Sequence, residues 1–335
     1  MIMRGPTLNR RRLLLATAAV FASTSRAPTS MAWAADAFPT KPVRLIVPEP
    51  PGGGNDALAR AIAQKLGDRL GQQVIVDNRA GASGMIAAEE VKRSAPDGYT
   101  LFLGQTQTLA VNPRLYAHLP YDPKTDFAPI SLIAAIPLVL LVHPSVPAHN
   151  LKELVALAAA HPGKLNFASA GNGSGSHLAG ALFKSVTHID ITHVPYKGTG
   201  PALADLLAGQ VQIFFSTLPS AVPYVRAGTV RALAVTGAAR VPALPQVPTA
   251  AEAGIPGFEV ALHYGILAPA KTPAGIVGRL NQALRQVMQD PLLVQRFDSM
   301  GIVPLSSTPD AFARDIEAEQ AKWGEMVRLS GAHVE

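Results

Sequence analysis

Short β-rich apolar runs alternate with helical periodicities along most of this chain, and this rhythm restricts the folds that it can adopt. Val43–Val47 is one such run, and Leu58, Ile62 and Leu66 then recur at the spacing of a buried helix face. Residues 74–76 form the next β-rich run. Two strands joined by a helix usually lie parallel in the same sheet, so the rhythm predicts mostly parallel sheets with helices on their faces.

The rhythm continues toward the C-terminus, where a second α/β series begins near Leu138. Further strands are predicted at residues 100–103, 138–142, 165–169, 191–194, 211–215, 231–235 and 260–267. Helices are predicted at 151–160, where Asn150 and Glu153 form an N-cap pair, and at 201–208. Two more helices are predicted to start at Thr272-Pro273 and at Thr308-Pro309. The last helix is expected to bury Phe312, Ile316, Trp323 and Val327.

The N-terminus has the pattern of an export signal. Arg10, Arg11 and Arg12 precede an apolar stretch over 13–22, which is too short to span a bilayer, and an A-x-A cleavage site ends at Ala34. Residues 1–34 are therefore predicted to be a signal peptide, with both the twin-arginine and the general secretory route left open. Cleavage near Ala34 predicts a periplasmic protein.

Composition excludes several classes of function. The net charge is +6, but removing the five arginines of residues 1–34 leaves 24 basic against 23 acidic residues, so no nucleic acid partner is expected. The sequence contains no cysteine, which excludes disulfides, thiol catalysis and a lipid anchor on cysteine. A length of 335 residues with 48% hydrophobic residues is enough for two domains.

Three glycine-rich loops, at 51–56, 80–84 and 171–176, each join a predicted strand to a predicted helix. Ligands of α/β sheets bind at the carboxyl ends of strands, and a helix N-terminus offers free N–H groups to an anion. Glycine allows a close approach of the backbone, and Ser or Asn adds hydrogen bonds. The loops therefore favour an anion site, although ordinary capped turns would look the same.

Motifs for nucleotide binding and catalysis are missing. The chain has no P-loop and no nucleophile elbow, and the glycines of 171–175 have the wrong spacing for a dinucleotide fingerprint. His177 with Ser174 or Ser176 could serve a cleft hydrolase or isomerase, but adjacent helical positions diverge. His188 and His193 lack the spacing of a zinc motif. Neither a cofactor nor a metal is expected.

An ordered set of motifs nevertheless resembles one known family. The motifs are VRLIVP (43–48), PPGGGND (50–56), DNRAGASG (77–84), APDGYTL (95–101), LPYDP (119–123), NFASAGNGS (166–174), HLAG (177–180), HVPYKG (193–198), DLLAGQV (205–211), RALAVT (231–236), VPT (247–249) and LAP (267–269). Together they resemble the Bug family, the extracytoplasmic receptors of tripartite tricarboxylate transporters, over essentially the whole mature chain.

The resemblance implies a fold, a function and partners. It implies a two-lobed α/β fold of the type II periplasmic-binding class, with lobe 1 formed by residues 37–137 and 241–335 and lobe 2 by residues 138–240. The implied function is capture of a small organic carboxylate between the lobes by a monomeric, non-enzymatic receptor. Its partner would be the membrane subunits of a transporter or a sensor kinase.

The resemblance also implies the ligand contacts, which are backbone amides, hydroxyls and ordered waters. The positions that match are Gly53, Gly54, Asn55, Asp56, Ala82 and Ser83 from the first lobe, and Ser169, Ala170, Asn172, Ser174, Ser176, His177, Tyr196, Lys197 and Ser216 from the second.

Some positions depart from the family pattern or vary within it, and these are candidates for specificity: Glu49, Gln105, His263 and Tyr264. Glu49 replaces an aromatic residue, and it would either disfavour a polyanion, pair with a ligand cation, or lie solvated at the rim. Ser216 replaces an Asp that is well placed for an amino group, which argues against an amino-acid ligand.

Overall fold

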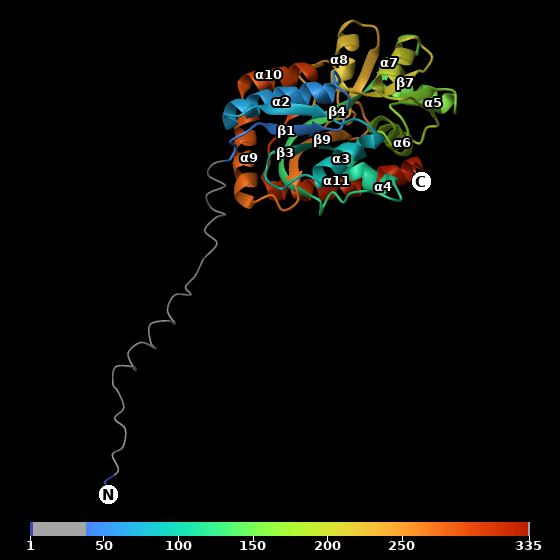
Figure 1. Ribbon diagram of the computed structural model, residues 1–335. Coiled ribbons are helices and arrows are strands. Elements are labelled where there is room, and N and C mark those ends of the chain that lie inside the picture. Colours follow the sequence, from blue (N-terminus) through green and yellow to red (C-terminus); the bar gives the residue numbers. More distant parts are fainter. Residues whose placement is uncertain (3–37, 334–335) are drawn as a thin grey trace. The chain divides into compact units, whose positions relative to one another are not determined.

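The strand-like runs pair into one continuous mixed sheet in the computed structural model, which describes residues 1–2 and 38–333 (Figure 1). The strand order is β2–β1–β3–β9–β4–β7–β5–β6, and both β8 and β10 pair with β4. The strands are β1 (Val43–Val47), β2 (Val74–Asn78), β3 (Thr100–Gln105), β4 (Phe127–Val142), β5 (Asn166–Ser169), β6 (Thr192–Pro195), β7 (Ile213–Thr217), β8 (Arg231–Val235), β9 (Ala261–Pro269) and β10 (Val303–Pro304).

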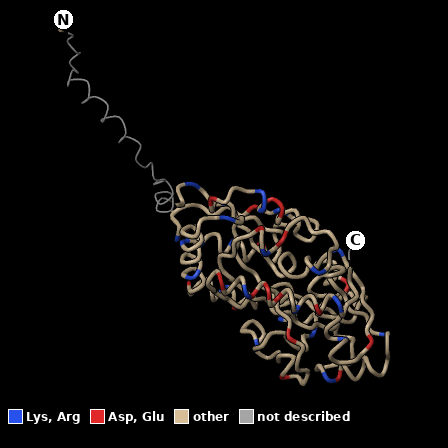
Figure 2. The backbone as a smooth tube through the Cα atoms, turned by 90° about the horizontal axis from the view of Figure 1, so that it is seen from below, with Lys and Arg blue, Asp and Glu red and all other residues tan. Residues whose placement is uncertain are grey.

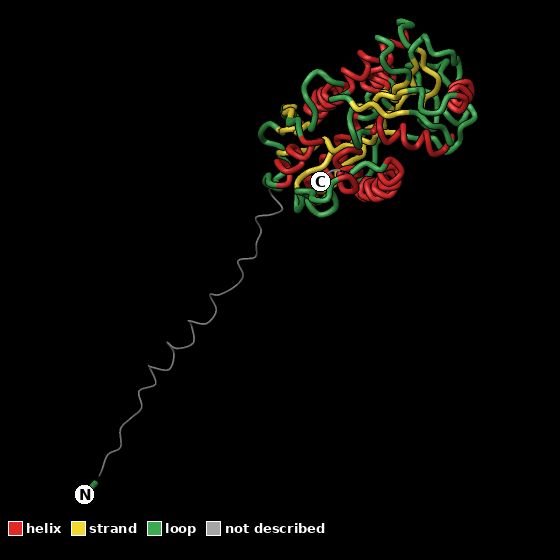
Figure 3. Tube along the Cα trace, turned by 90° about the vertical axis from the view of Figure 1, so that its right-hand side faces the viewer, coloured by secondary structure: helices red, strands yellow, loops and turns green. Residues whose placement is uncertain are grey.

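Helices surround these strands, as Figure 3 shows. They are α2 (Gly54–Leu70), α3 (Met85–Lys92), α4 (Asn112–Leu115), α5 (Leu151–Ala160), α6 (Gly175–Thr187), α7 (Thr199–Leu207), α8 (Leu218–Arg226), α9 (Ala274–Val287), α10 (Pro291–Met300) and α11 (Pro309–Ser330). Two further turns are η1 (Ala82–Gly84) and the π-helical η2 (Gln107–Val111).

Strand β4 divides the sheet into two groups of strands. Its residues from Phe127 to Pro137 pair antiparallel with β9, which in turn pairs antiparallel with β3. From Leu138 to Val142 it pairs antiparallel with β7 and β8 instead. We call β1, β2, β3, β9 and β10 the first strand group and β5 to β8 the second. Parallel pairing, as predicted, joins β1 to both β2 and β3, and β5 to both β6 and β7.

Two of the three predicted helix starts are confirmed by their capping contacts, whereas α9 begins at Ala274 with Pro273 at the cap position and no side-chain cap. Asn150 Oδ1 accepts a hydrogen bond from the Glu153 N–H at 2.9 Å, and Glu153 Oε2 accepts one from the His149 N–H at 2.7 Å. Thr308 Oγ1 caps α11 by accepting from the Ala311 N–H. These side chains satisfy N–H groups that a helix leaves unpaired at its first turn.

Helix α11 contributes to the hydrophobic cores of both strand groups. Phe312 and Ile316 pack in a core with residues of β1, β3 and β9. About two to three turns after Ile316, Trp323, Met326 and Val327 pack in another core that includes residues of β4, β5, β7 and α6. The predicted buried face of this helix is thereby confirmed.

Proline concealed two elements of the fold from the sequence analysis. Strand β4 begins well before the predicted residue 138, although it contains Pro129 and Pro137, because the register shifts at a bulge beside Pro129. Helix α8 contains Pro219 in its first turn and Pro223 inside it. The short run of α10 was also missed; it begins at Pro291 behind the capping residue Asp290.

Basic and acidic residues are interspersed along the described backbone, as Figure 2 shows, which agrees with the near-neutral charge expected of the mature chain. No helix among the described residues is both long and apolar enough to cross a bilayer. Apart from its first two residues, the predicted signal peptide lies outside the described part. The lobe boundaries stay predictions, since the chain from Pro39 onward forms one compact unit.

Two facing glycines let the first strand group pack closely. Gly104 of β3 pairs directly with Gly265 of β9. A Cβ on Gly265 would lie 2.0 Å from a ring carbon of Phe312, and a Cβ on Gly104 would lie 2.4 Å from Leu267. The ring of Phe312 therefore occupies the space that a side chain at 265 would take, which brings α11 against the strand backbone.

We predict that Gly265→Ala lowers the free energy of unfolding by about 2 to 3 kcal/mol, because the added methyl group overpacks a core that cannot expand freely. Gly278→Ala is the matched control: a Cβ there meets nothing within 4 Å, and alanine favours the helix by about 1 kcal/mol. Urea unfolding of both variants measures the difference. Equal midpoints would contradict the packing argument.

Candidate functional site

A cavity of about 680 Å³ lies where loops from both strand groups meet. Eleven of the predicted residues border it: Glu49, Gly53, Gly54, Asn55, Ser83, Gln105, Ala170, Asn172, Ser174, Ser176 and Tyr264. Eight predicted residues do not: Asp56, Ala82, Ser169, His177, Tyr196, Lys197, Ser216 and His263. The three glycine-rich loops of the sequence are therefore brought to one place.

The first of these loops is held by a buried carboxylate. Asp56 Oδ2 accepts hydrogen bonds from the Gly52 N–H and from Arg60 Nε, and Oδ1 accepts one from Asn78 Nδ2 at 3.0 Å. The hydrogen bond with Arg60 lowers the pKa of Asp56, so the group stays ionised. Asp56 thus fixes the loop from behind, where it does not border the cavity.

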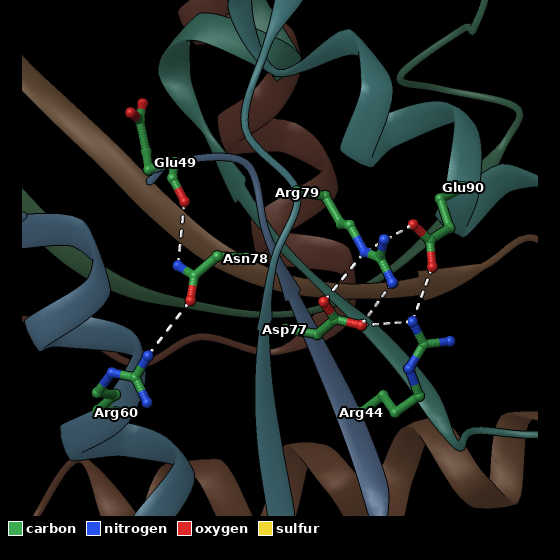
Figure 4. Close-up of polar contacts among 7 residues, drawn as sticks. All are labelled: Arg44, Glu49, Arg60, Asp77, Asn78, Arg79 and Glu90. Carbon is green, nitrogen blue, oxygen red and sulfur yellow. Dashed lines mark hydrogen bonds and ion pairs between the residues drawn. The ribbon is translucent and has the colours of Figure 1, made fainter. Parts of the chain in front are cut away.

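Asn78 links the same loop to the end of β2. Its Nδ2 also donates to the backbone oxygen of Glu49 at 3.0 Å, and its Oδ1 accepts from Arg60, as Figure 4 shows. Helix α2 then begins at Gly54 without a side-chain cap. Its first turn therefore borders the cavity with N–H groups that no capping side chain occupies.

The second loop is a left-handed turn. Gly81, Ala82, Ser83 and Gly84 all have positive φ angles, a conformation that costs energy for residues with a Cβ. Asn112 Nδ2 donates to the Ser83 backbone oxygen at 3.0 Å, and the Ser83 hydroxyl lies 2.9 Å from that of Tyr116. The turn directs Ser83 to the cavity, whereas Ala82 does not border it.

The third loop is closed by its own serines. Ser174 Oγ donates to the Gly171 oxygen at 2.7 Å and accepts from the His177 N–H, which caps helix α6. Ser176 Oγ accepts from the Ala170 N–H at 2.8 Å. The loop geometry is thus set before any ligand arrives.

Behind this loop lies a stack of three rings. The ring centroids of His177 and His193 are 3.9 Å apart and the rings are nearly parallel, and the Phe167 ring stacks on His193 with centroids 4.9 Å apart. His177 Nδ1 accepts from the Gly173 N–H, and His193 Nε2 lies 2.6 Å from Ser169 Oγ. Burial lowers the pKa of His177, and burial with the neighbouring charge of His177 lowers that of His193 to about 4. Both rings are therefore neutral near pH 7.

Three further predicted residues outside the cavity, Tyr196, Ser216 and His263, have hydrogen-bond partners. Tyr196 donates its hydroxyl hydrogen to Asp205, and the fully buried Ser216 donates to the Thr217 oxygen. His263 Nδ1 lies 3.0 Å from Asp315 of α11. Burial opposes protonation of His263, but the hydrogen bond with Asp315 prevails and raises its pKa.

Several cavity residues were missed by the sequence analysis. Gly198, Thr199 and Gly200 border it at the start of α7, and Thr217, Pro219 and Ser220 border it at the start of α8. The Gly-Thr-Gly run after β6 repeats the strand, glycine loop and helix pattern of the other loops, so this signal was available. The start of α8 carried no such signal, because its prolines suggest a turn.

Four helix starts consequently border one cavity, those of α2, α6, α7 and α8. Each helix N-terminus carries about half a positive charge and unpaired N–H groups. Among the described residues that border the cavity there is no lysine, arginine or histidine. The arrangement therefore suits an anion that is bound by backbone groups and hydroxyls.

The opposite wall is a network of polar side chains from the first strand group. Asn55 Nδ2 donates to Gln105 Oε1 at 3.2 Å, and Gln105 Nε2 donates to Glu49 Oε1 at 3.1 Å. Gln105 pairs in register with Tyr264, which is buried. Burial raises the pKa of Glu49 against the effect of the Gln105 hydrogen bond, and burial together with the charge of Glu49 raises that of Tyr264.

The ring stack generates a prediction about pH. Unfolded His193 takes up a proton near pH 6.5 and the folded residue only near pH 4, so its contribution to stability is complete above pH 6.5 and is lost as the pH falls toward 4. We expect the free energy of unfolding of wild type to fall by about 1 to 2 kcal/mol more than that of His193→Gln over this pH range. This value is reduced because the ring is partly exposed. Urea unfolding at both ends of the range measures it, with the exposed His118→Gln as the control. Parallel pH profiles for wild type and His193→Gln would contradict the neutral stack.

Comparison with known proteins identifies the family. Residues 58–331 match the model of the tripartite tricarboxylate transporter family receptor. The chain is 39% identical to the solved Rhodopseudomonas palustris protein Rpa4515 with adipate, with a TM-score of 0.82 over 89% of this chain and 100% of that one. It is 36% identical to R. palustris MatC with bound malate, with a TM-score of 0.76 over 87% and 100% of the two chains.

A third solved structure is that of the periplasmic binding protein BugD, which is 34% identical and has a TM-score of 0.78 over 89% of this chain and 100% of that chain. The sheet, the cavity and these similarities all indicate the same family and fold. The chain belongs to the tripartite tricarboxylate transporter receptor family, and its α/β fold is the two-lobed type II fold of periplasmic binding proteins.

Proposed function

We propose that this protein captures a small organic carboxylate in its cavity and delivers it to the membrane subunits of a tripartite tricarboxylate-type transporter. The convergence of four helix starts on the cavity is the observation that carries the proposal. Similar proteins solved with adipate and with malate support the same ligand class. The ligand carboxylate would accept hydrogen bonds from backbone N–H groups in both strand groups.

A binding protein is favoured over an enzyme by the pairing of the serines and histidines. Ser169 Oγ lies 2.6 Å from His193, but Ser169 is fully buried behind the loop. Ser145 Oγ lies 2.7 Å from His143, but neither residue borders the cavity. Ser174 already donates to a backbone oxygen, and the Nδ1 of His177 accepts from one N–H. A nucleophile needs a base within hydrogen-bond reach and access to its substrate, and these residues do not combine the two.

The proposed function also includes the residues that contact the ligand and the division of the chain into two lobes. We infer that the eleven predicted residues bordering the cavity contact the ligand, and that the lobes divide near residues 137 and 240. The exchange of partners within β4 between Pro137 and Leu138 supports the first boundary. We further propose a monomeric periplasmic receptor that is exported with cleavage near Ala34; the family and the signal pattern of the sequence support the export and the location.

We predict that Gly53→Leu abolishes binding without unfolding the protein. Gly53 has φ −84° and ψ 174°, which any residue adopts, and a Cβ there meets nothing within 4 Å. The leucine side chain would therefore enter the cavity and displace the ligand. Calorimetry against mono- and dicarboxylates should give a Kd of about 1 μM or tighter for wild type, equal to about −8 kcal/mol, and a loss of at least about a hundredfold for the variant.

Gly278→Leu provides the matched control, because this exposed helix position also has open space around its Cβ and does not border the cavity. It should bind like wild type. Folded wild-type protein that binds no carboxylate of any kind would overturn the proposed function. Undiminished binding by Gly53→Leu would place the ligand elsewhere.

A further inference from the structure

The cavity contains a negative charge that has no basic side chain as a partner among the described residues. Among the described residues that border it, Glu49 is the one with a formal charge. Its carboxylate is half-buried, and its contacts come from neutral amides, through the hydrogen bond from Gln105 and an interaction with Asn55. No lysine or arginine of the described chain forms an ion pair with it.

The nearby arginines are committed to other carboxylates, as Figure 4 shows. Arg44 bonds to Asp77 at 2.6 Å and to Glu90 at 2.7 Å. Arg79 Nε lies 3.0 Å from Asp77 and 3.2 Å from Glu90. The side chain of Glu49 points away from this cluster, while its backbone oxygen faces Asn78. The charge of Glu49 is thus left to whatever enters the cavity.

Glu49 also has a fixed position. Its backbone is held by Asn78, and its carboxylate by Gln105, whose own oxygen is held by Asn55. A carboxylate that cannot turn away to solvent without breaking these bonds acts on a ligand as a fixed charge. At short range in a partly buried site, like charges repel and opposite charges attract by more than they do in water.

The two kinds of wall suggest opposite ends of one ligand. The starts of α6, α7 and α8, from the second strand group, present N–H groups to an anion. Gln105 ends β3, and Glu49 follows β1 and interacts with Asn55 in the first turn of α2. A second carboxylate on the ligand would meet Glu49, whereas an ammonium group there would be paired.

We propose that Glu49 sets the ligand class of this receptor: the cavity takes a monocarboxylate with a positively charged group at its far end in preference to a dicarboxylate of the same length. This proposal rests on the proposed function, since it assumes that a carboxylate is bound. It assigns Glu49 a role in specificity, by direct contact with the distal group of the ligand.

Matched ligands test the charge at the far end without changing the rest of the molecule. One set is hexanoate, adipate and 6-aminohexanoate, and a second set is butanoate, succinate and 4-aminobutanoate. Calorimetry at low ionic strength should show the amino member binding wild type at least about tenfold more tightly than the dicarboxylate of equal length, a difference of about 1.4 kcal/mol.

Glu49→Gln removes the charge and keeps the shape and the Gln105 contact. We expect it to reduce the preference for the amino member by at least about tenfold, chiefly by tighter binding of the dicarboxylate. Glu90→Gln is the control, because it also removes one carboxylate, on α3, but does not border the cavity, and it should keep the wild-type ratio.

The outcomes separate this proposal from the proposed function. Dicarboxylates that bind wild type as tightly as their amino partners would overturn the role of Glu49 and leave carboxylate capture intact. A preference for the amino member that persists in Glu49→Gln would do the same. If no member of either set binds wild type or variant, this inference fails, while the proposed function fails only if folded wild-type protein binds no carboxylate of any kind.

Discussion

The structure depends on the exchange of pairing partners within strand β4. One half of this strand completes the first strand group through β9, and the other half completes the second through β7 and β8. Because both halves are one continuous backbone, the two groups are held in a defined relation to each other. The loops after β1, β3, β5 and β6 consequently meet at a single cavity, as ligand sites of α/β sheets do at strand ends.

Ionisable side chains in this site mostly hold loops, and backbone groups and neutral side chains face the cavity. Asp56 and the pair of His177 with His193 lie behind the loops, each satisfied by hydrogen bonds or stacking. A buried charge or imidazole is inexpensive there because its partners are fixed by the fold. The cavity receives its positive potential from helix starts, which add no mobile charge and need no reorganisation when an anion arrives.

The sequence predicted those features that are determined locally. The capping pair of Asn150 with Glu153 and the start of α11 at Pro309 depend on residues within a few positions of each other, and both are found. Side-chain direction was harder to predict. Whether Asp56 faces the cavity or the loop depends on Asn78, and the position of His177 depends on His193, both distant in the sequence. Prolines 219 and 223 likewise hid a helix whose stability comes from packing rather than from propensity.

The attachment of α11 to both cores has a mechanical consequence. A receptor of this fold opens and closes by rotating its halves, and rotation is easiest where only a few extended connections cross between them. Here a long helix also crosses, with Phe312 buried at one side and Trp323 at the other. A rotation of one strand group against the other would therefore have to move this helix relative to at least one of its two cores, so the packing of α11 opposes such a rotation.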